Sequence, residues 1–205
     1  MKKIAFILCS IVSFTSFAQQ NTFPDRFSLE AGYGYVMPMG TVENGEAADY
    51  SDFKNLHLGA HYLITDVLGA RFSYNYADFQ NKDSNYYGST YHRFTLEATY
   101  DVYGAIMNQE SPFKTNDRFE GIVHAGAGIS FSQPDFDKSI LDKGVGIQFG
   151  IQPKYYITNN LSLFLDATYV MNMMRDYGID GVSVLDGGST SYVSAVLGVN
   201  YRFGN

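Results

Sequence analysis

Nearly all charged side chains in eight segments of this 205-residue chain fall on one set of alternating positions. A period of two is typical of β-strands, and no segment sustains the 3.6-residue period of a helix. The segments are 27–37, 55–63, 67–78, 91–102, 119–131, 144–156, 161–171 and 191–203. The sequence therefore predicts an all-β fold with eight antiparallel strands.

The two faces of these strands differ in kind. Between Leu161 and Val170, leucines alternate with polar or aromatic residues, and Asp166 falls on the opposite face from Leu165. The apolar face carries no charge within the segments except for Asp78, which ends the third segment. The charges on the other face that we assign to one network are Glu30, Arg71, Arg93, Glu97, Glu120, Lys154, Asp166 and Arg202.

The apolar face is expected to point outward. In a soluble sandwich or lipocalin-like barrel it would point inward, yet the interior of eight strands is only just wide enough for side chains. An apolar surface with tyrosines towards the strand ends suits lipid flanked by aromatic girdles, and the charged face suits a lumen. We therefore predict an eight-stranded antiparallel up-and-down transmembrane β-barrel.

The first residues are those of a secretory signal. Lys2 and Lys3 precede an apolar run that is too short to span a bilayer, and Ala18 ends a small-x-small cleavage site. The expected domains are a signal peptide over 1–18 and a barrel over 19–205. The one cysteine, Cys9, lies in the signal, so the mature chain offers no disulfide and no thiolate metal site.

Charge and connector length predict the orientation of the barrel. Without Lys2 and Lys3, 12 basic residues face 21 acidic ones, a net charge of −9 that disfavours nucleic acid as a partner. The links after the first, third, fifth and seventh segments are long and acidic, whereas those at ITDV and ITNN are tight turns. Bacterial barrels have longer outside loops, so both termini are expected to be periplasmic. The link from Tyr103 to Arg118 is long for a periplasmic turn.

The chain resembles a known family. The signal, the eight segments, the ITD and ITNN turns and the closing VSAVLGVNYRFGN are similar to small outer-membrane β-barrels of the OmpX and OmpA transmembrane-domain type. PKYYITNNLSLFLDATY resembles Bacteroidetes "porin family" outer-membrane proteins. The resemblance implies insertion by the barrel-assembly machinery, which reads a terminal signal that corresponds here to Leu197, Val199, Tyr201 and Phe203.

Two interpretations of the lumen charges stay open. The charges form either a salt-bridged plug or a gated ion path, and the resemblance favours the plug. His57, His61 and His124 share the lumen face, where hydrogen bonding is the simpler role, and no metal site is predicted. His92 faces outward without the serine and acid that lipid A chemistry would need. The run Asp135 to Ser139 lacks the glycine and closing Glu of an EF-hand loop.

The sequence thus predicts a non-enzymatic, porin-like protein of the Gram-negative cell envelope, with no catalytic residue and no cofactor. It is expected to be a monomer that contacts outer-membrane lipid and lipopolysaccharide. Its role would be structural, in envelope integrity, or surface binding through acidic extracellular loops. The alternatives are a narrow ion or small-solute channel and an accessory to an assembly or secretion machine.

Overall fold

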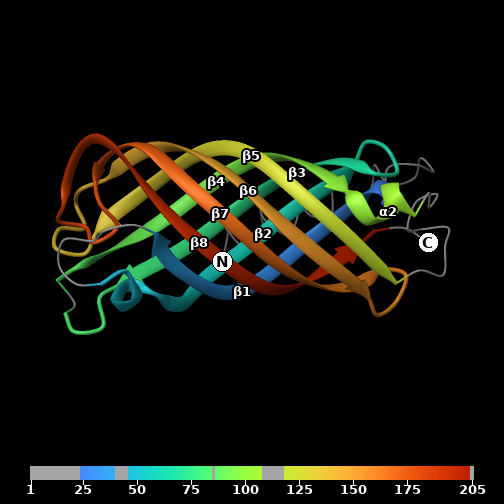
Figure 1. The fold of residues 1–205 in the computed structure, drawn as a ribbon, viewed down its shortest axis with the longest axis horizontal. Helices are drawn as coiled ribbons and strands as arrows, with labels where there is room; N and C mark the ends of the chain where they lie inside the picture. The colour runs from blue at the N-terminus through green and yellow to red at the C-terminus, as the bar shows by residue number, and fades with distance from the viewer. Residues whose placement is uncertain (1–23, 40–45, 85, 108–117, 204–205) are drawn as a thin grey trace, which may run out of the picture.

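Eight antiparallel strands form a closed barrel in the computed structural model, which describes residues 24–39, 46–84, 86–107 and 118–203. Each strand pairs with its neighbours in sequence, and β1 closes the ring against β8 (Figure 1). The strands are β1 (Phe27–Met39), β2 (Asp52–Leu63), β3 (Leu68–Gln80), β4 (Gly88–Asp101), β5 (Phe119–Pro134), β6 (Asp142–Tyr156), β7 (Leu161–Tyr177) and β8 (Val184–Arg202). The predicted fold class is confirmed. Residues 1–18, the predicted signal, lie outside the described residues.

One end of the barrel, the turn end, carries tight links. Thr65 accepts a hydrogen bond from the backbone N–H of Leu68 at 2.9 Å, and Thr158 accepts one from Leu161 at 3.0 Å. The two ITxx sequences therefore make the same side-chain-stabilised turn. The helix α2 (Val102–Ile106) follows β4 at this end.

The opposite end, the loop end, carries the links after β1, β3, β5 and β7 (Figure 1). There the strands run further than the alternation predicted, and β7 and β8 reach 17 and 19 residues. The short 3-10 helix η3 (Ala47–Tyr50) lies in the β1–β2 loop, and η2 (Pro24–Arg26) precedes β1. The barrel is therefore longer at the loop end than the alternating segments alone.

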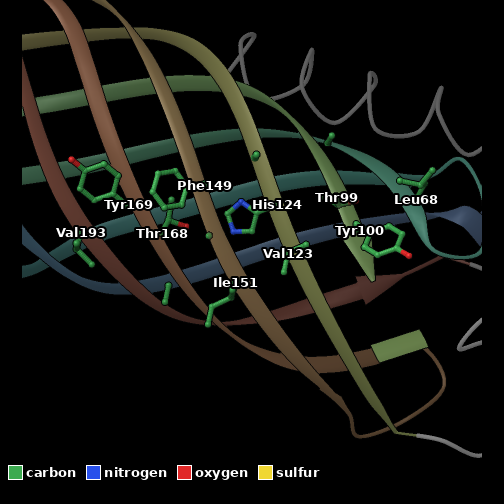
Figure 2. A pocket seen from close by; sticks show the side chains of 14 residues that line it. Leu68, Thr99, Tyr100, Val123, His124, Phe149, Ile151, Thr168, Tyr169 and Val193 are labelled. Carbon is green, nitrogen blue, oxygen red and sulfur yellow. The ribbon is translucent and has the colours of Figure 1, made fainter. Parts of the chain in front are cut away.

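The outward face is apolar around the barrel. Leu96, Leu165 and Leu197 are each more than half exposed. A shallow groove of about 700 Å³ crosses this face, with Ala98, Ala125 and Ala167 among its lining. Figure 2 labels the larger residues around it, among them Tyr100, Phe149 and Tyr169. Small side chains between larger ones make this depression, whose surface is almost wholly apolar.

The described helices are short. Within the four described ranges, no helix has the length and apolar character that crossing a membrane requires.

Candidate functional site

Seven charged or titratable side chains meet in the middle of the barrel, each from a different strand of β1 to β7. We call them the central charge cluster: Glu30, His57, Arg71, Glu97, His124, Lys154 and Asp166. All are at most 3% exposed. Alternation turns every second side chain inward, and closure of the ring brings the seven together.

Arg71 is the hub of this cluster. Its guanidinium lies 2.7 Å from Glu97, 3.1 Å from Asp166 and 3.3 Å from Glu30. His124 lies 2.8 Å from Glu97 and 3.4 Å from Asp166. One arginine thus contacts three carboxylates from three other strands, a network that low dielectric makes strong only while every member is present.

Glu30 closes the cluster on the side of β1. Lys154 lies 2.7 Å from it, Gln152 donates a hydrogen bond at 3.1 Å, and His57 lies 3.5 Å away. Towards the loop end, the Ser73 hydroxyl donates a hydrogen bond to Glu97 at 2.7 Å. A second hydrogen bond joins the hydroxyls of Ser73 and Thr95. A polar layer therefore continues the network along the axis.

Two of the predicted lumen charges, Glu120 and Arg202, lie outside the hub's contacts and share Tyr156 instead. The Tyr156 hydroxyl donates to Glu120 at 2.9 Å, while Arg202 donates to the same hydroxyl and stands 4.8 Å above the tyrosine ring. This smaller polar cluster lies towards the turn end.

Arg93 stands apart from all the acids of the predicted set. It is buried, donates to the Tyr192 hydroxyl and lies 5.5 Å from the centroid of that ring. No described carboxylate forms an ion pair with it. Its charge is therefore stabilised by a hydroxyl and an aromatic face.

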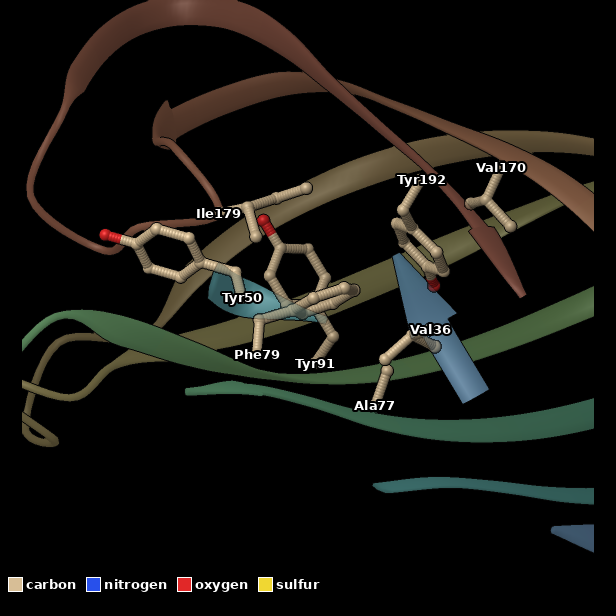
Figure 3. Close-up of a cluster of buried hydrophobic side chains, with 8 residues drawn as sticks. All are labelled: Val36, Tyr50, Ala77, Phe79, Tyr91, Val170, Ile179 and Tyr192. Atoms are coloured by element: carbon tan, nitrogen blue, oxygen red, sulfur yellow. The ribbon is translucent and has the colours of Figure 1, made fainter. Parts of the chain in front are cut away.

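Between the polar layers and the loops, an aromatic plug fills the loop end of the interior (Figure 3). Phe79, Tyr91 and Tyr192 meet edge to face at 5.1–6.2 Å between ring centroids. The plug consists of Val36, Tyr50, Ala77, Phe79, Tyr91, Val170, Ile179 and Tyr192, none more than 5% exposed. Sequence reasoning expected a polar lumen throughout and missed this layer, although continuing the alternation along β3, β4 and β8 indicates it.

A further ion pair that the sequence did not indicate caps the plug. Arg175 lies 2.9 Å from Asp142, donates to Ser132, and places its guanidinium 4.9 Å from the Tyr91 ring centroid. The pairing of β7 with β8 shifts register around Met174, which has a φ of +60°. This bulge reverses the alternation, so Arg175 faces inward although its position in the period predicts the outside.

The histidines have ordinary hydrogen-bond partners. His57 pairs with Asn75 at 2.9 Å and His61 with Thr99 at 2.8 Å, both inside the barrel. On the outward face His92 pairs with the Tyr74 hydroxyl at 2.9 Å. Among the described residues, no group of three or more His, Cys, Asp or Glu side chains has a geometry that could hold a metal ion.

The loops at the loop end are tied into one body, which we call the loop cap. Gly88 donates to the Asp180 carbonyl at 2.8 Å and accepts from the Asp135 N–H at 3.0 Å, so it joins three loops. Lys82 donates to the Asp49 carbonyl at 3.2 Å, which adds the β1–β2 loop, and Ser89 donates to Ile179 at 2.6 Å. The described parts of all four loops are thereby connected.

Gly88 is suited to this junction for two reasons. Its φ of +144° is a conformation that other residues rarely adopt, and a Cβ there would lie 2.3 Å from the Phe79 carbonyl oxygen. Only a glycine lets the three loops approach so closely.

The residues of the predicted assembly signal lie along β8 and just beyond it. Leu197, Val199 and Tyr201 are exposed on the outward face, and Phe203 stacks on Phe27 with the ring centroids 5.7 Å apart. The reading of this segment by an assembly machine stays a prediction.

Comparisons with known proteins agree with this architecture. The family model described as outer membrane protein β-barrel domain matches residues 5–203. Neisserial surface protein A has a solved structure similar to this one, with a TM-score of 0.58 and 18% identity over 86% of this chain and 97% of that one.

Two further solved structures are similar at lower scores. OprG from Pseudomonas aeruginosa gives 0.48 at 15% identity, over 91% of this chain and 99% of that one. Ail, the attachment invasion locus protein of Yersinia pestis, gives 0.44 at 14%, over 87% and 99%. At 18% identity, the likeness to Neisserial surface protein A concerns the fold alone. No curated protein matches the chain.

Proposed function

Since the chain belongs to the outer membrane protein β-barrel domain family and is therefore a bacterial outer-membrane protein, we propose that it presents a rigid binding surface outside the cell. The loop cap is this surface, and both termini are periplasmic. The barrel is the membrane anchor, and no enzymatic step is part of the role.

The loop cap is the observation that carries this proposal. Hydrogen bonds at Gly88 and between Lys82 and Asp49 connect loops that otherwise join only neighbouring strands. A surface that is already ordered loses little conformational entropy when a partner binds. Longer loops on the outside are also the rule for bacterial barrels, which supports the assigned orientation.

A genetic experiment in the source organism tests the role. A strain without the protein would be complemented with the native chain, with a variant whose β3–β4 and β5–β6 loops are shortened to tight turns, and with an interior variant, Gln148→Ala. We expect the loop variant to insert in the membrane but to fail to restore attachment or envelope phenotypes, and the interior variant to restore them. Full complementation by the loop variant would overturn the proposal.

A narrow channel is the first alternative. Conduction requires a continuous water path, whereas the central charge cluster and the aromatic plug occupy successive levels of the interior. The alternative predicts that Glu97→Gln alters discrete conductance in planar bilayers, and the absence of such events from folded protein would dismiss it.

An assembly or secretion accessory is the second alternative. Exposed Ile106 and Met107 lie at the turn end, at the start of the long link to Arg118, whose residues 108–117 lie outside the described part. The alternative predicts that a periplasmic protein co-purifies after cross-linking and is lost when this link is shortened.

A further inference from the structure

Four aromatic rings form a row across three loops of the cap. Tyr86 and Tyr87 belong to the β3–β4 loop, Phe136 to the β5–β6 loop, and Tyr177 to the end of β7. The ring centroids of Tyr86 lie 5.2 Å from Tyr87 and 6.0 Å from Phe136, and those of Phe136 and Tyr177 lie 6.0 Å apart. We call these four residues the aromatic row.

The row is anchored at one end and partly open to solvent along its length. Tyr87 packs against the aromatic plug, whereas Tyr86 is 56% exposed, and Phe136 and Tyr177 are half-buried. Gly88, which joins the three loops, directly follows Tyr87 in sequence. The position of the rings is therefore fixed by the hydrogen bonds of the cap.

Exposed carboxylates accompany each part of the row. Asp83, Asp137 and Asp176 are exposed and lie within three residues of a ring in sequence. None of the three forms an ion pair with a described base. Hydrogen bonds from the Ser139 hydroxyl and N–H lower the pKa of Asp137 and so favour its ionised form.

The charge of the surrounding loops has the same sign. Residues 46–54, 78–88, 135–143 and 175–186 contain five basic and eleven acidic side chains, a net charge of −6. Bases in these loops already have acidic partners, since Lys54 contacts Asp52 and Asp78, Lys138 contacts Asp135, and Arg175 contacts Asp142. Such a surface attracts cations and repels polyanions.

We propose that the aromatic row is the docking site for a basic, arginine-bearing segment of a polypeptide partner. Guanidinium groups would stack on the rings, and the neighbouring carboxylates would accept their hydrogen bonds. Rings spaced along an extended row fit successive side chains of such a segment. The inference deepens the proposed function, on which it rests, by naming the place and the chemistry of binding.

The first test measures binding of a fluorescein-labelled nona-arginine peptide to the full chain in phosphatidylcholine nanodiscs by fluorescence anisotropy. Empty nanodiscs and a nona-glutamate peptide are the controls, and both are expected to give no signal. We expect binding that weakens with added salt, as exposed charges are screened. No binding of nona-arginine would overturn the inference.

Matched variants separate the row from general charge attraction. The double variant Tyr86→Ala with Phe136→Ala should weaken binding by about 4- to 25-fold, at about two- to fivefold per ring. Asp137→Asn and Asp66→Asn remove the same charge, but Asp66 is exposed in the tight turn between β2 and β3, at the opposite end of the barrel. We expect Asp137→Asn to weaken binding more. If both Asp→Asn variants weakened binding equally and the Tyr86→Ala, Phe136→Ala variant did not weaken it, general charge attraction would explain the binding. That result would overturn the site.

Other occupants are outcomes of the same experiment. Displacement of the peptide by a neutral oligosaccharide would assign the row to sugars, and self-association that Tyr86→Ala abolishes would assign it to a second copy. Either result overturns the inference. Unfolding of a variant is checked by its gel shift on heating, with Phe53→Ala, an exposed aromatic of β2, as the matched change.

The two proposals fail separately. If the peptide does not bind but the shortened loops still abolish complementation, the proposed function stands and this inference falls. If the shortened loops complement fully, both fall.

Discussion

At the scale of the residue, Arg71 determines whether the interior charges are compatible with burial. Its guanidinium contacts carboxylates of Glu30, Glu97 and Asp166, all excluded from water. Removing one partner of such a network leaves the others charged and unsolvated, which costs more than the original network contributed. The sign and position of each charge matter more here than the number of ion pairs.

Arg71→Met should lower the free energy of unfolding by about 3–5 kcal/mol, the usual cost of breaking a buried ion pair. The measurement is urea unfolding of the protein in lipid vesicles, followed by its gel shift on heating. Lys54→Met is the matched control, since that lysine makes half-exposed ion pairs at the loop end and should cost at most about 1 kcal/mol. Similar losses in the two variants would contradict the role of Arg71.

Sequence alone could place most of these residues but could not pair them. Alternation turned Arg71, Glu97 and Asp166 inward, because side chains of a strand alternate between two faces. Which charges meet across the ring depends on strand register, which a single sequence does not state. Arg93 illustrates this, since it lies on the predicted inward face yet meets Tyr192 and no described acid.

At the scale of the element, the strands were predicted well in the middle and poorly at the loop end. The bulge at Met174 reverses the alternation of β7, so no periodic rule could turn Arg175 inward. The aromatic plug was missed for another reason. Inward-facing Tyr91 and Tyr192 look like lipid-facing aromatics when only their composition is considered.

Lipid exposure of β7 gives a second prediction. Leu165→Arg places a charge on the apolar outward face and should destabilise the inserted barrel by about 2–4 kcal/mol if it lies near the midplane. Val184→Arg, at a residue that is also exposed but lies at the loop end of β8, should cost about 0–1 kcal/mol. Folding titrations into lipid vesicles measure both, and equal tolerance of the two would contradict the orientation of the faces.

The junction of the loops gives a third prediction. Gly88→Ala should release the loop cap, because a Cβ there meets the Phe79 carbonyl at 2.3 Å. Gly187→Ala is the control, since that glycine also has a positive φ but no atom lies within 4 Å of its added Cβ. Limited proteolysis of intact vesicles should cut the Gly88 variant faster in the loops while the barrel stays folded. Equal cleavage of both variants would mean that positive φ alone explains the effect.

At the scale of the whole molecule, the interior contains two obstructions in series. The central charge cluster fills the middle and the aromatic plug fills the loop end. If either the cluster or the plug were removed, the other would still block passage of ions through the barrel. The barrel is thus filled by side chains along much of its length, as expected for eight strands.

This arrangement gives a fourth prediction, for conductance in planar bilayers. The native chain should show no discrete openings, and neither should Phe79→Ala with Tyr91→Ala, because the charge cluster remains. Adding Arg71→Ala and Glu97→Ala to that variant should create ion-conducting events in protein that still shows its gel shift on heating. Discrete openings of the native chain would contradict the series arrangement.

The central charge cluster also has a consequence for assembly. Its members come from seven strands, and Glu30 on β1 meets Lys154 on β6 only across the interior. Arg71 and Glu97 already lie opposite each other on β3 and β4, but in an open sheet Glu30 would lack Lys154 and remain hydrated. The contact between Glu30 and Lys154 therefore forms, and both side chains lose their water, when β1 joins β8. The cluster thus favours the correctly closed ring. Reversing one of these charges should therefore slow the joining of β1 to β8.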